Sequence, residues 1–330
     1  MKMLAVQYSS AGVEIETLKS LEDLKTRGDN SQLWLDISEY GEEEELTPLA
    51  KAFHLHPLAL EDCYNVRQRP KIDEFTDNLF IVARTIFNKD PAYSEGYQLG
   101  IFLGKNFLIT IHVRPMPQLD LVLTVIRKGE PRIVTGSPSF LLHAILNKVV
   151  DNFEESVSKS EDMETELGTE VLKDPPPNNI LNLIYTCRRN LLLVRRFLRP
   201  QSDGLERLMV RSRADDNLVD RGSQVFMRDV FDHTKRTLDR IDSLLDMNIG
   251  TLNIYLSSVS NKMNDAMRLM AAITAIVAIP SVIGSLLGMN LIGNPWPWEL
   301  WTVGIIASSA AIAIIVYFIF KGWLFNRLRL

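Results

Sequence analysis

The sequence predicts a membrane protein with an N-terminal α/β domain, a long helix and two C-terminal membrane-spanning helices. Three observations predict this class. Short strand-like runs mix with helical stretches up to about residue 135, strand signals stop from Ser137 onward, and two uncharged apolar runs follow near the C-terminus. The 330-residue chain is 46% hydrophobic and 23% charged, values that resemble a soluble protein because averages conceal this segregation.

In the first part of the chain, apolar patterning predicts strands and helices in alternation. The strand segments are Met3 to Tyr8, Val13 to Leu18, Leu33 to Ile37, Leu79 to Ile86 and Leu99 to Val113. Gly104, Lys105 and Asn106 interrupt the last segment, which predicts a hairpin turn between two strands. The helical segments are Glu42 to Phe53, Pro57 to Asn65 and Met116 to Arg127.

A helical hairpin is predicted next, from Ser139 to Leu172 and from Asn179 to Leu198. Three consecutive prolines from Pro175 end its first helix, and we expect Pro200 to end the second. The first helix has an acidic face that we expect to be exposed. That face consists of Asp151, Glu154, Glu155, Glu161, Asp162, Glu164, Glu166 and Glu170.

A long helix is allowed after Gly204, because no proline occurs before Pro280. About 80 helical residues would extend roughly 120 Å, more than a globular domain needs. Apolar residues recur at mostly three- and four-residue steps, with Asn248 at one such position: Leu238, Ile241, Leu245, Leu252, Tyr255, Val259 and Met263. Two interpretations stay open: a coiled-coil stripe that meets other copies, or an amphipathic face that packs on its own domain.

Two membrane spans are predicted, Met270 to Met289 and Leu300 to Phe320, because neither contains a charged residue and about 20 helical residues cross a bilayer. Basic residues precede the first span and follow the second, whereas the connecting loop has none, so both ends are expected in the cytoplasm of a multi-pass cell-membrane protein. The expected divisions are 1–204 (cytoplasmic domain, with the helical hairpin at about 137–200), 205–269 (stalk helix), 270–289 (first span), 290–299 (extracytoplasmic loop), 300–320 (second span) and 321–330 (cytoplasmic tail).

Charge and motif content exclude several function classes. A net charge of −5 and a pI near 5.7 argue against a nucleic-acid partner, because a nucleic-acid binder normally presents a basic face to the phosphates. The sequence has no P-loop, so we expect no nucleotide partner, and it has no Ser/His/Asp or HExxH motif, so we expect no enzyme. The two cysteines, Cys63 and Cys187, have neither disulfide nor zinc-site spacing.

The first span has a stripe of small and weakly polar residues. Helical periodicity from Asn264 leads through Ala271, Thr274 or Ala275, Ala278, and Ser281 or Val282 to Ser285. Two helices cannot enclose a water-filled path, so transport through this stripe requires several subunits around an axis. A narrow pore and a closely packed helix pair both predict small residues, here including a Gly284–Gly288 GxxxG pair, and both interpretations stay open.

Three segments resemble the CorA family of magnesium channels. They are SSVSNKMNDAMRLM from Ser257, the Gly288-Met289-Asn290 tripeptide placed between two terminal spans, and HPLALEDCYNVRQRPKIDEF from His56. The resemblance implies a funnel-shaped homopentamer that admits Mg²⁺, and also Co²⁺ or Ni²⁺, passively under the membrane potential. It also implies that intracellular Mg²⁺, both transported ion and regulatory ligand, gates the channel.

The resemblance implies roles for individual residues. Gly288, Met289 and Asn290 would form the selectivity filter, and Asn264, Met267, Ala271, Ala278, Ser281 and Ser285 would line the pore. Glu299, in the extracytoplasmic loop, would add attraction for cations at the mouth. Asp62 and Asp229 match the family's cytoplasmic regulatory positions, where carboxylates of neighbouring subunits would hold Mg²⁺.

Two alternatives are kept. A ZntB-like zinc transporter shares the architecture, and His54 and His56 form an HxH pair with zinc-ligand chemistry. A membrane-anchored sensor would use the two spans only as an anchor. The GMN tripeptide favours magnesium, cobalt or nickel over zinc, and an anchor has no reason to place Asn264 and Asn290 at opposite ends of a small-residue stripe.

Overall fold

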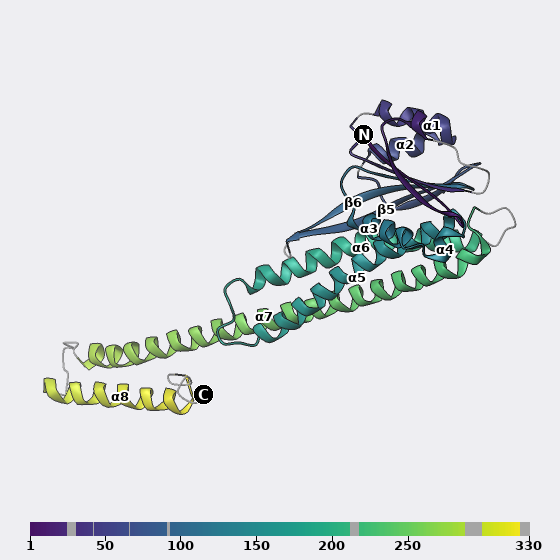
Figure 1. Ribbon diagram of the computed structural model, residues 1–330. Coiled ribbons are helices and arrows are strands. Elements are labelled where there is room, and N and C mark those ends of the chain that lie inside the picture. Colours follow the sequence, from purple (N-terminus) through teal and green to yellow (C-terminus); the bar gives the residue numbers. More distant parts are fainter. Residues whose placement is uncertain are drawn as a thin grey trace. The chain divides into compact units, whose positions relative to one another are not determined.

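The computed structural model describes residues 1–24, 31–41, 43–65, 67–90, 93–211, 218–287 and 299–323 (Figure 1). It divides into two compact units, Met1–Thr251 and Leu252–Leu330. The first unit holds the sheet and the helices packed on it, and the second holds the C-terminal part of α7 together with α8.

A seven-stranded mixed sheet forms the centre of the first unit, in the order β2-β1-β3-β7-β6-β5-β4. Its strands are β1 Lys2–Ser9, β2 Gly12–Leu18, β3 Gln32–Ser38, β4 Lys71–Glu74, β5 Leu79–Asp90, β6 Tyr93–Leu103 and β7 Phe107–His112. All pairs are antiparallel except β3 with β7. The predicted strands are confirmed, including the hairpin between β6 and β7, whereas the short strand β4 was missed.

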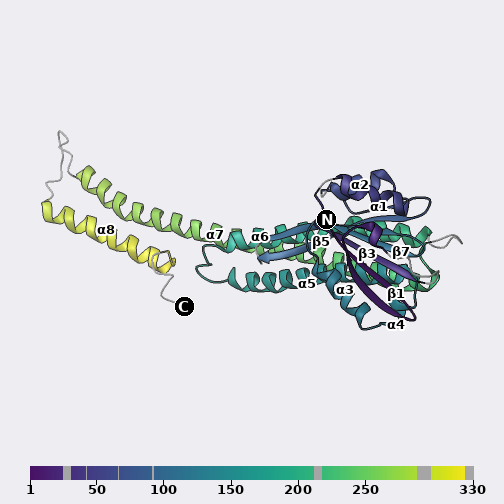
Figure 2. The same ribbon diagram turned by 45° about the horizontal axis from the view of Figure 1, so that its top comes forward.

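Helices cover both faces of this sheet (Figure 2). The helices α1 Thr47–Phe53 and α2 Pro57–Tyr64 lie on one face. The other face carries α3 Pro117–Arg127, the short α4 Pro131–Val134, α5 Pro138–Glu170 and α6 Ile180–Arg211. Short 3-10 turns, η1 Leu21–Asp23 and η2 Glu43–Leu46, precede β3 and α1. The expected helix from Glu42 to Phe53 is therefore α-helical only in its second part.

Two apolar layers hold the first unit together. Between the sheet and α1–α2, the core includes Leu35, Leu49, Leu60, Phe80 and Phe102, all buried. On the opposite face, each long helix contributes a periodic stripe of fully buried residues: Ile145 and Phe153 on α5, Ile184 and Leu191 on α6, and Ile241 on α7. Burial of such side chains stabilises the fold by about 1.5–3 kcal/mol each.

The prediction that Pro200 ends the second hairpin helix was wrong. Pro200 lies inside α6, which continues to Arg211. Proline removes a helix hydrogen bond. The neighbouring side chains of Leu198, Leu205 and Leu208 are buried. The Gln201 side chain also accepts a hydrogen bond of 2.9 Å from the Arg84 backbone amide. Tertiary packing therefore offsets the local cost of the proline.

The prediction of an unbroken helix from Gly204 was also wrong, since α6 runs to Arg211 and α7 begins at Arg221. From there α7 extends to Leu287, through Pro280. Its apolar C-terminal part and α8, Leu300–Phe320, are both long and apolar enough to cross a membrane, and almost none of either is buried.

The two interpretations of the apolar stripe from Leu238 to Met263, packing on its own domain and contact with other copies, apply to different parts of α7. Ile241, Leu245 and Asn248 are buried within the first unit, so this part packs on its own domain. Val259 and Met263 are exposed in the single chain, which leaves that part of the stripe available to other copies.

Candidate functional site

The candidate pore residues lie on one face of α7 in the second unit. Steps of three, four and seven residues bring them to the same side of the helix. All six side chains are exposed in the single chain, whereas the neighbouring Ala272 is completely buried. The stripe consists of Asn264, Met267, Ala271, Ala278, Ser281 and Ser285.

Hydroxyl groups along this helix are tied to their own backbone. Thr274 Oγ1 donates to the Met270 carbonyl at 2.8 Å, and Ser281 Oγ donates to the Val277 carbonyl at 2.7 Å. The donor of each hydroxyl is thus satisfied inside the helix, and its oxygen keeps the capacity to accept from water. Such a surface is weakly polar and carries no charge.

Gly288, Met289 and Asn290, which the family resemblance predicts to form the filter, lie outside the described residues. Glu299 is described as the N-cap residue of α8. Its carboxylate accepts a hydrogen bond from Trp301 Nε1, and its backbone carbonyl accepts one from Thr302. An acid at a helix N-terminus is stabilised by the helix dipole, so Glu299 has a structural role beside any role at the mouth.

Asp62 is bound within its own chain. The Lys71 ammonium lies 2.6 Å from one carboxylate oxygen, and Gln68 Nε2 donates to the other at 2.6 Å. Burial tends to lower the pKa of Lys71, but hydrogen bonds to Asp62 and Asp73 outweigh burial and raise it. Lys71 therefore stays charged and offsets the carboxylate of Asp62, to which the family resemblance gives a regulatory metal role.

Asp229 lies exposed on α7. Its charge acts on His143 of α5, where burial lowers the imidazole pKa and the carboxylate of Asp229 partly opposes that shift. Asp62 contacts Lys71 and Gln68, whereas Asp229 acts on His143, and among the described residues the single chain shows no contact between the two aspartates.

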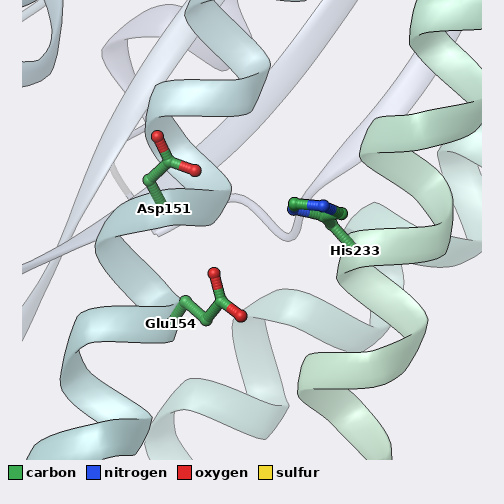
Figure 3. Close-up of side chains that lie close together, drawn as sticks. All are labelled: Asp151, Glu154 and His233. Atoms are coloured by element: carbon green, nitrogen blue, oxygen red, sulfur yellow. The ribbon is translucent and has the colours of Figure 1, made fainter.

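A mixed cluster of metal-ligand type lies between α5 and α7 instead. Asp151 and Glu154 extend from consecutive turns of α5 toward His233 of α7, and one potential ligand atom of each lies within 4.8 Å of the others (Figure 3). All three side chains are partly buried. Two carboxylates and an imidazole form a donor set that suits divalent transition metals, and the carboxylates also suit Mg²⁺.

The immediate surroundings of this cluster limit its charge. Lys148 Nζ lies 2.7 Å from an oxygen of Asp151, and the Arg240 guanidinium lies 3.7 Å from Glu154. His233 Nδ1 is buried and lacks a hydrogen-bond partner among the described residues. The imidazole therefore offers a donor atom that the protein itself leaves unused.

Sequence reasoning missed this cluster. The sequence places Asp151 and Glu154 on an acidic face expected to be exposed, and it gives His233 no role. Acids at an i, i+3 spacing were visible, but the approach of α7 to that face depends on tertiary packing.

Glu164 was also assigned to the exposed acidic face, and this prediction was wrong. The side chain is 1% exposed. Its carboxylate accepts hydrogen bonds from Asn248 Nδ2 at 2.8 Å and Thr251 Oγ1 at 2.6 Å. Burial, together with the nearby Glu164 charge, raises the pKa of the Cys187 thiol to about 12, so this cysteine stays protonated. A buried carboxylate with these partners links α5 to α7.

The HxH pair has local structural roles. His56 is the N-cap residue of α2, where Nδ1 accepts a hydrogen bond of 3.2 Å from the Leu58 amide, and its ring stacks on Phe75 at 4.6 Å. His54 adopts a left-handed conformation at the C-cap of α1. Since one ring nitrogen of His56 already caps a helix, the pair is not arranged as a zinc chelate.

Comparison with known proteins identifies the family to which this architecture belongs. A family model described as CorA-like Mg²⁺ transporter protein matches residues 29–321. The cobalt/magnesium transport protein CorA of Thermotoga maritima is 29% identical over 315 residues, covering 94% of this chain and 89% of that protein. The protein of the same name from Methanocaldococcus jannaschii is 25% identical over 299 residues, covering 88% and 91%.

A solved structure shows the same fold. The complete structure of the CorA magnesium transporter from Methanocaldococcus jannaschii matches with a TM-score of 0.82 at 22% identity, covering 98% of this chain and 99% of that chain. The match includes the N-terminal α/β domain, the long helix and the C-terminal helix.

Proposed function

The chain belongs to the CorA family of divalent metal ion transporters, and we propose that it forms a homopentameric channel for passive Mg²⁺ influx. Co²⁺ and Ni²⁺ are further candidate ions. The proposal places the protein in the cell membrane, with both termini in the cytoplasm and the 290–299 loop outside, in keeping with the distribution of basic residues around the two spans.

One observation carries this proposal. The face of α7 that bears Asn264, Ala271, Ala278 and Ser285 is exposed in the single chain, small and uncharged. A lipid-facing helix has no need of a polar asparagine at one end of such a stripe, whereas several copies that turn this face inward would line a narrow, hydrated path. Five copies follow from the family resemblance.

The filter chemistry supports Mg²⁺ as the ion. Mg²⁺ gives up its water reluctantly, and a ring of Asn290 amide oxygens would accept hydrogen bonds from the hydrated ion without removing its shell. In the proposal Gly288 and Met289 shape the backbone that presents this ring. Glu299, on the same connecting loop in sequence, adds negative charge that favours cation entry.

The driving force needs no energy-coupling domain. Each elementary charge gains about 2.3 kcal/mol per 100 mV, so a divalent ion entering a negative interior gains roughly twice that. A gate is then required, because this gradient would otherwise fill the cytoplasm with cations.

Two cytoplasmic sites are proposed for the gating ion. The family positions Asp62 and Asp229 would meet only across a subunit interface, and there Lys71 would have to release Asp62. Asp151, Glu154 and His233 already lie together within one chain. We assign the regulatory cation first to this cluster, because its three side chains come from a single chain; Lys148 would have to release Asp151 on binding, as Lys71 would release Asp62.

The imidazole of His233 favours an alternative function, transport of zinc. Nitrogen ligands favour Co²⁺, Ni²⁺ and Zn²⁺ over Mg²⁺, so a ZntB-like zinc transporter remains the second candidate function. Parallel uptake measurements with Mg²⁺ and Zn²⁺ separate the two.

The deciding experiment measures Mg²⁺ uptake into proteoliposomes that enclose a Mg²⁺-sensitive dye. The wild type is compared with Asn290→Ala and with Asn294→Ala, a matched change in the same loop outside the filter tripeptide. We expect influx for wild type and Asn294→Ala and at least a tenfold slower rate for Asn290→Ala. If the folded, oligomeric wild type admits neither Mg²⁺ nor Zn²⁺, the channel proposal fails and a membrane-anchored sensor replaces it.

A further inference from the structure

A strongly basic pocket lies in the first unit, between the 67–70 segment, β5 and α6. Its volume is about 450 Å³. Six arginines line it, against a single acid, Asp203. The arginines are Arg67, Arg69, Arg84, Arg195, Arg196 and Arg199. This concentration of positive charge stands out in a chain whose net charge is −5.

The pocket lining holds one acid against six arginines, and one of the arginines pairs with an acid of α7. Arg195 pairs with Asp242 at 3.2 Å. For Arg67, Arg69, Arg196 and Arg199, no ion pair is recorded within the described ranges. These four arginines are exposed to solvent, and several positive charges around one concave surface attract an anion that can contact more than one of them.

Arg84 is the most buried member of the set, at 9% exposed. Its guanidinium lies over the Phe197 ring, 4.9 Å from the centroid. Burial, and then the charge of Arg196, lower the pKa of Arg84. The Arg84 guanidinium is thus fixed against Phe197 at the wall that Arg196 also lines, where a phosphate chain could contact both groups.

A second pocket adjoins the first and shares Arg84 with it. Its volume is about 620 Å³, and its lining includes Tyr40, Tyr97 and Gln98. Gln98 is 8% exposed; its Nε2 donates to the Asp62 carbonyl at 2.6 Å, and its Oε1 is buried with no hydrogen-bond partner among the described residues. Aromatic and amide side chains around a hollow of this size form the kind of lining that takes the uncharged part of a ligand such as a nucleoside.

We infer that the two pockets together bind a nucleoside di- or triphosphate, with the phosphates against the arginines and the nucleoside beside Tyr97 and Gln98. Guanidinium groups match phosphate oxygens in pairs. Six of them exceed the charge of roughly −2 that one phosphate carries, which favours a phosphate chain over a monophosphate. This ligand runs counter to the expectation of no nucleotide partner, which rested on the missing P-loop; here guanidinium groups from three separate segments replace a glycine-rich loop.

The test uses the purified full-length chain in detergent, with a chelator present so that metals do not contribute. Equilibrium dialysis measures binding of ATP, tripolyphosphate and adenosine. We expect saturable ATP binding near one per chain, weaker tripolyphosphate binding and still weaker adenosine binding. Equal affinity for ATP and tripolyphosphate would remove the nucleoside pocket from the proposal, and failure of both to bind would overturn the whole inference.

Variants locate the binding. Arg196→Gln combined with Arg199→Gln should weaken ATP binding at least tenfold, whereas Arg188→Gln, the same change on α6 outside both pocket linings, should stay within twofold of wild type. Should the first variant unfold early in a thermal scan, Arg67→Gln with Arg69→Gln tests the same pocket from a different segment. An equal loss in Arg188→Gln would reduce the effect to general charge attraction and contradict a defined site. ATP binding is measured without ion transport, so the result tests this inference separately from the channel proposal.

Discussion

Asn248 of α7 donates a hydrogen bond of 2.8 Å to the carboxylate of Glu164 on α5, and both side chains are buried. Asn248 Nδ2 also donates to the Ile184 carbonyl of α6 at 3.2 Å. One amide group therefore connects the three long helices. A buried carboxylate is tolerated only with such donors, because desolvation of an unpartnered charge is costly.

Asn248→Leu should destabilise the protein. The substitution removes a charge-assisted hydrogen bond from Glu164 and leaves the carboxylate with fewer donors, at a cost of about 2–3 kcal/mol. Chemical denaturation of the detergent-purified protein measures the change. Asn182→Leu, the same replacement at an exposed position of α6, is the control, and equal stability of the two variants would contradict the role of this network.

Stability should depend on pH through His112. Its Nε2 lies 3.1 Å from Asp36 Oδ1, and its Nδ1 contacts the Arg114 carbonyl. Burial lowers the pKa of His112, but the Asp36 interaction and the carbonyl outweigh it, so the folded-state pKa is raised. The contribution is complete below the unfolded pKa of about 6.5 and is lost as pH rises through the higher folded value.

As pH rises above about 6.5, the unfolding midpoint of the wild type should therefore fall more steeply than that of His112→Gln, which cannot gain a proton. Thermal scans of both proteins at several pH values measure the difference. Parallel curves for the two proteins would show that the pair does not contribute.

Divalent cations should stabilise the first unit through Asp151, Glu154 and His233. A ligand that binds only the folded state raises stability by about 2.7 kcal/mol at a hundredfold excess over Kd. Co²⁺ and Mg²⁺ should raise the unfolding midpoint of the wild type, and Glu154→Gln or His233→Gln should lose most of this rise. Glu155→Gln changes an exposed neighbour that pairs with Lys159 and serves as the control; an equal loss there would assign the effect to bulk charge.

Ala278→Phe should block ion uptake. In a pore of several copies, one ring from each subunit would fill the axis at this level and slow Mg²⁺ influx by about tenfold or more. Val277→Phe places the same ring on an exposed site about 100° around the helix, and its uptake should stay near wild type. The dye-loaded proteoliposome assay measures Mg²⁺ influx for both variants. Slower influx for Val277→Phe than for Ala278→Phe would place the pore on another face of α7.

Local signals were sufficient for much of the fold. Strand alternation predicted β1, β2, β3, β5, β6 and β7, because each strand buries one or both faces in a fixed register. The two candidate spans followed from their uncharged length alone. β4 and α4, each four residues long, were too short to show a period.

The sequence by itself determined the class of the protein, its two candidate spans and the candidate pore stripe, since these depend on residues adjacent in the chain or related by helical period. The tertiary structure alone decided that Pro200 stays helical, that Glu164 is buried on Asn248, that His233 meets Asp151 and Glu154, and that arginines of the 67–70 segment, β5 and α6 line one pocket. The physical reason is the same in each case: the free energy of these groups is set by partners from other helices and strands, and no local period encodes which partner arrives.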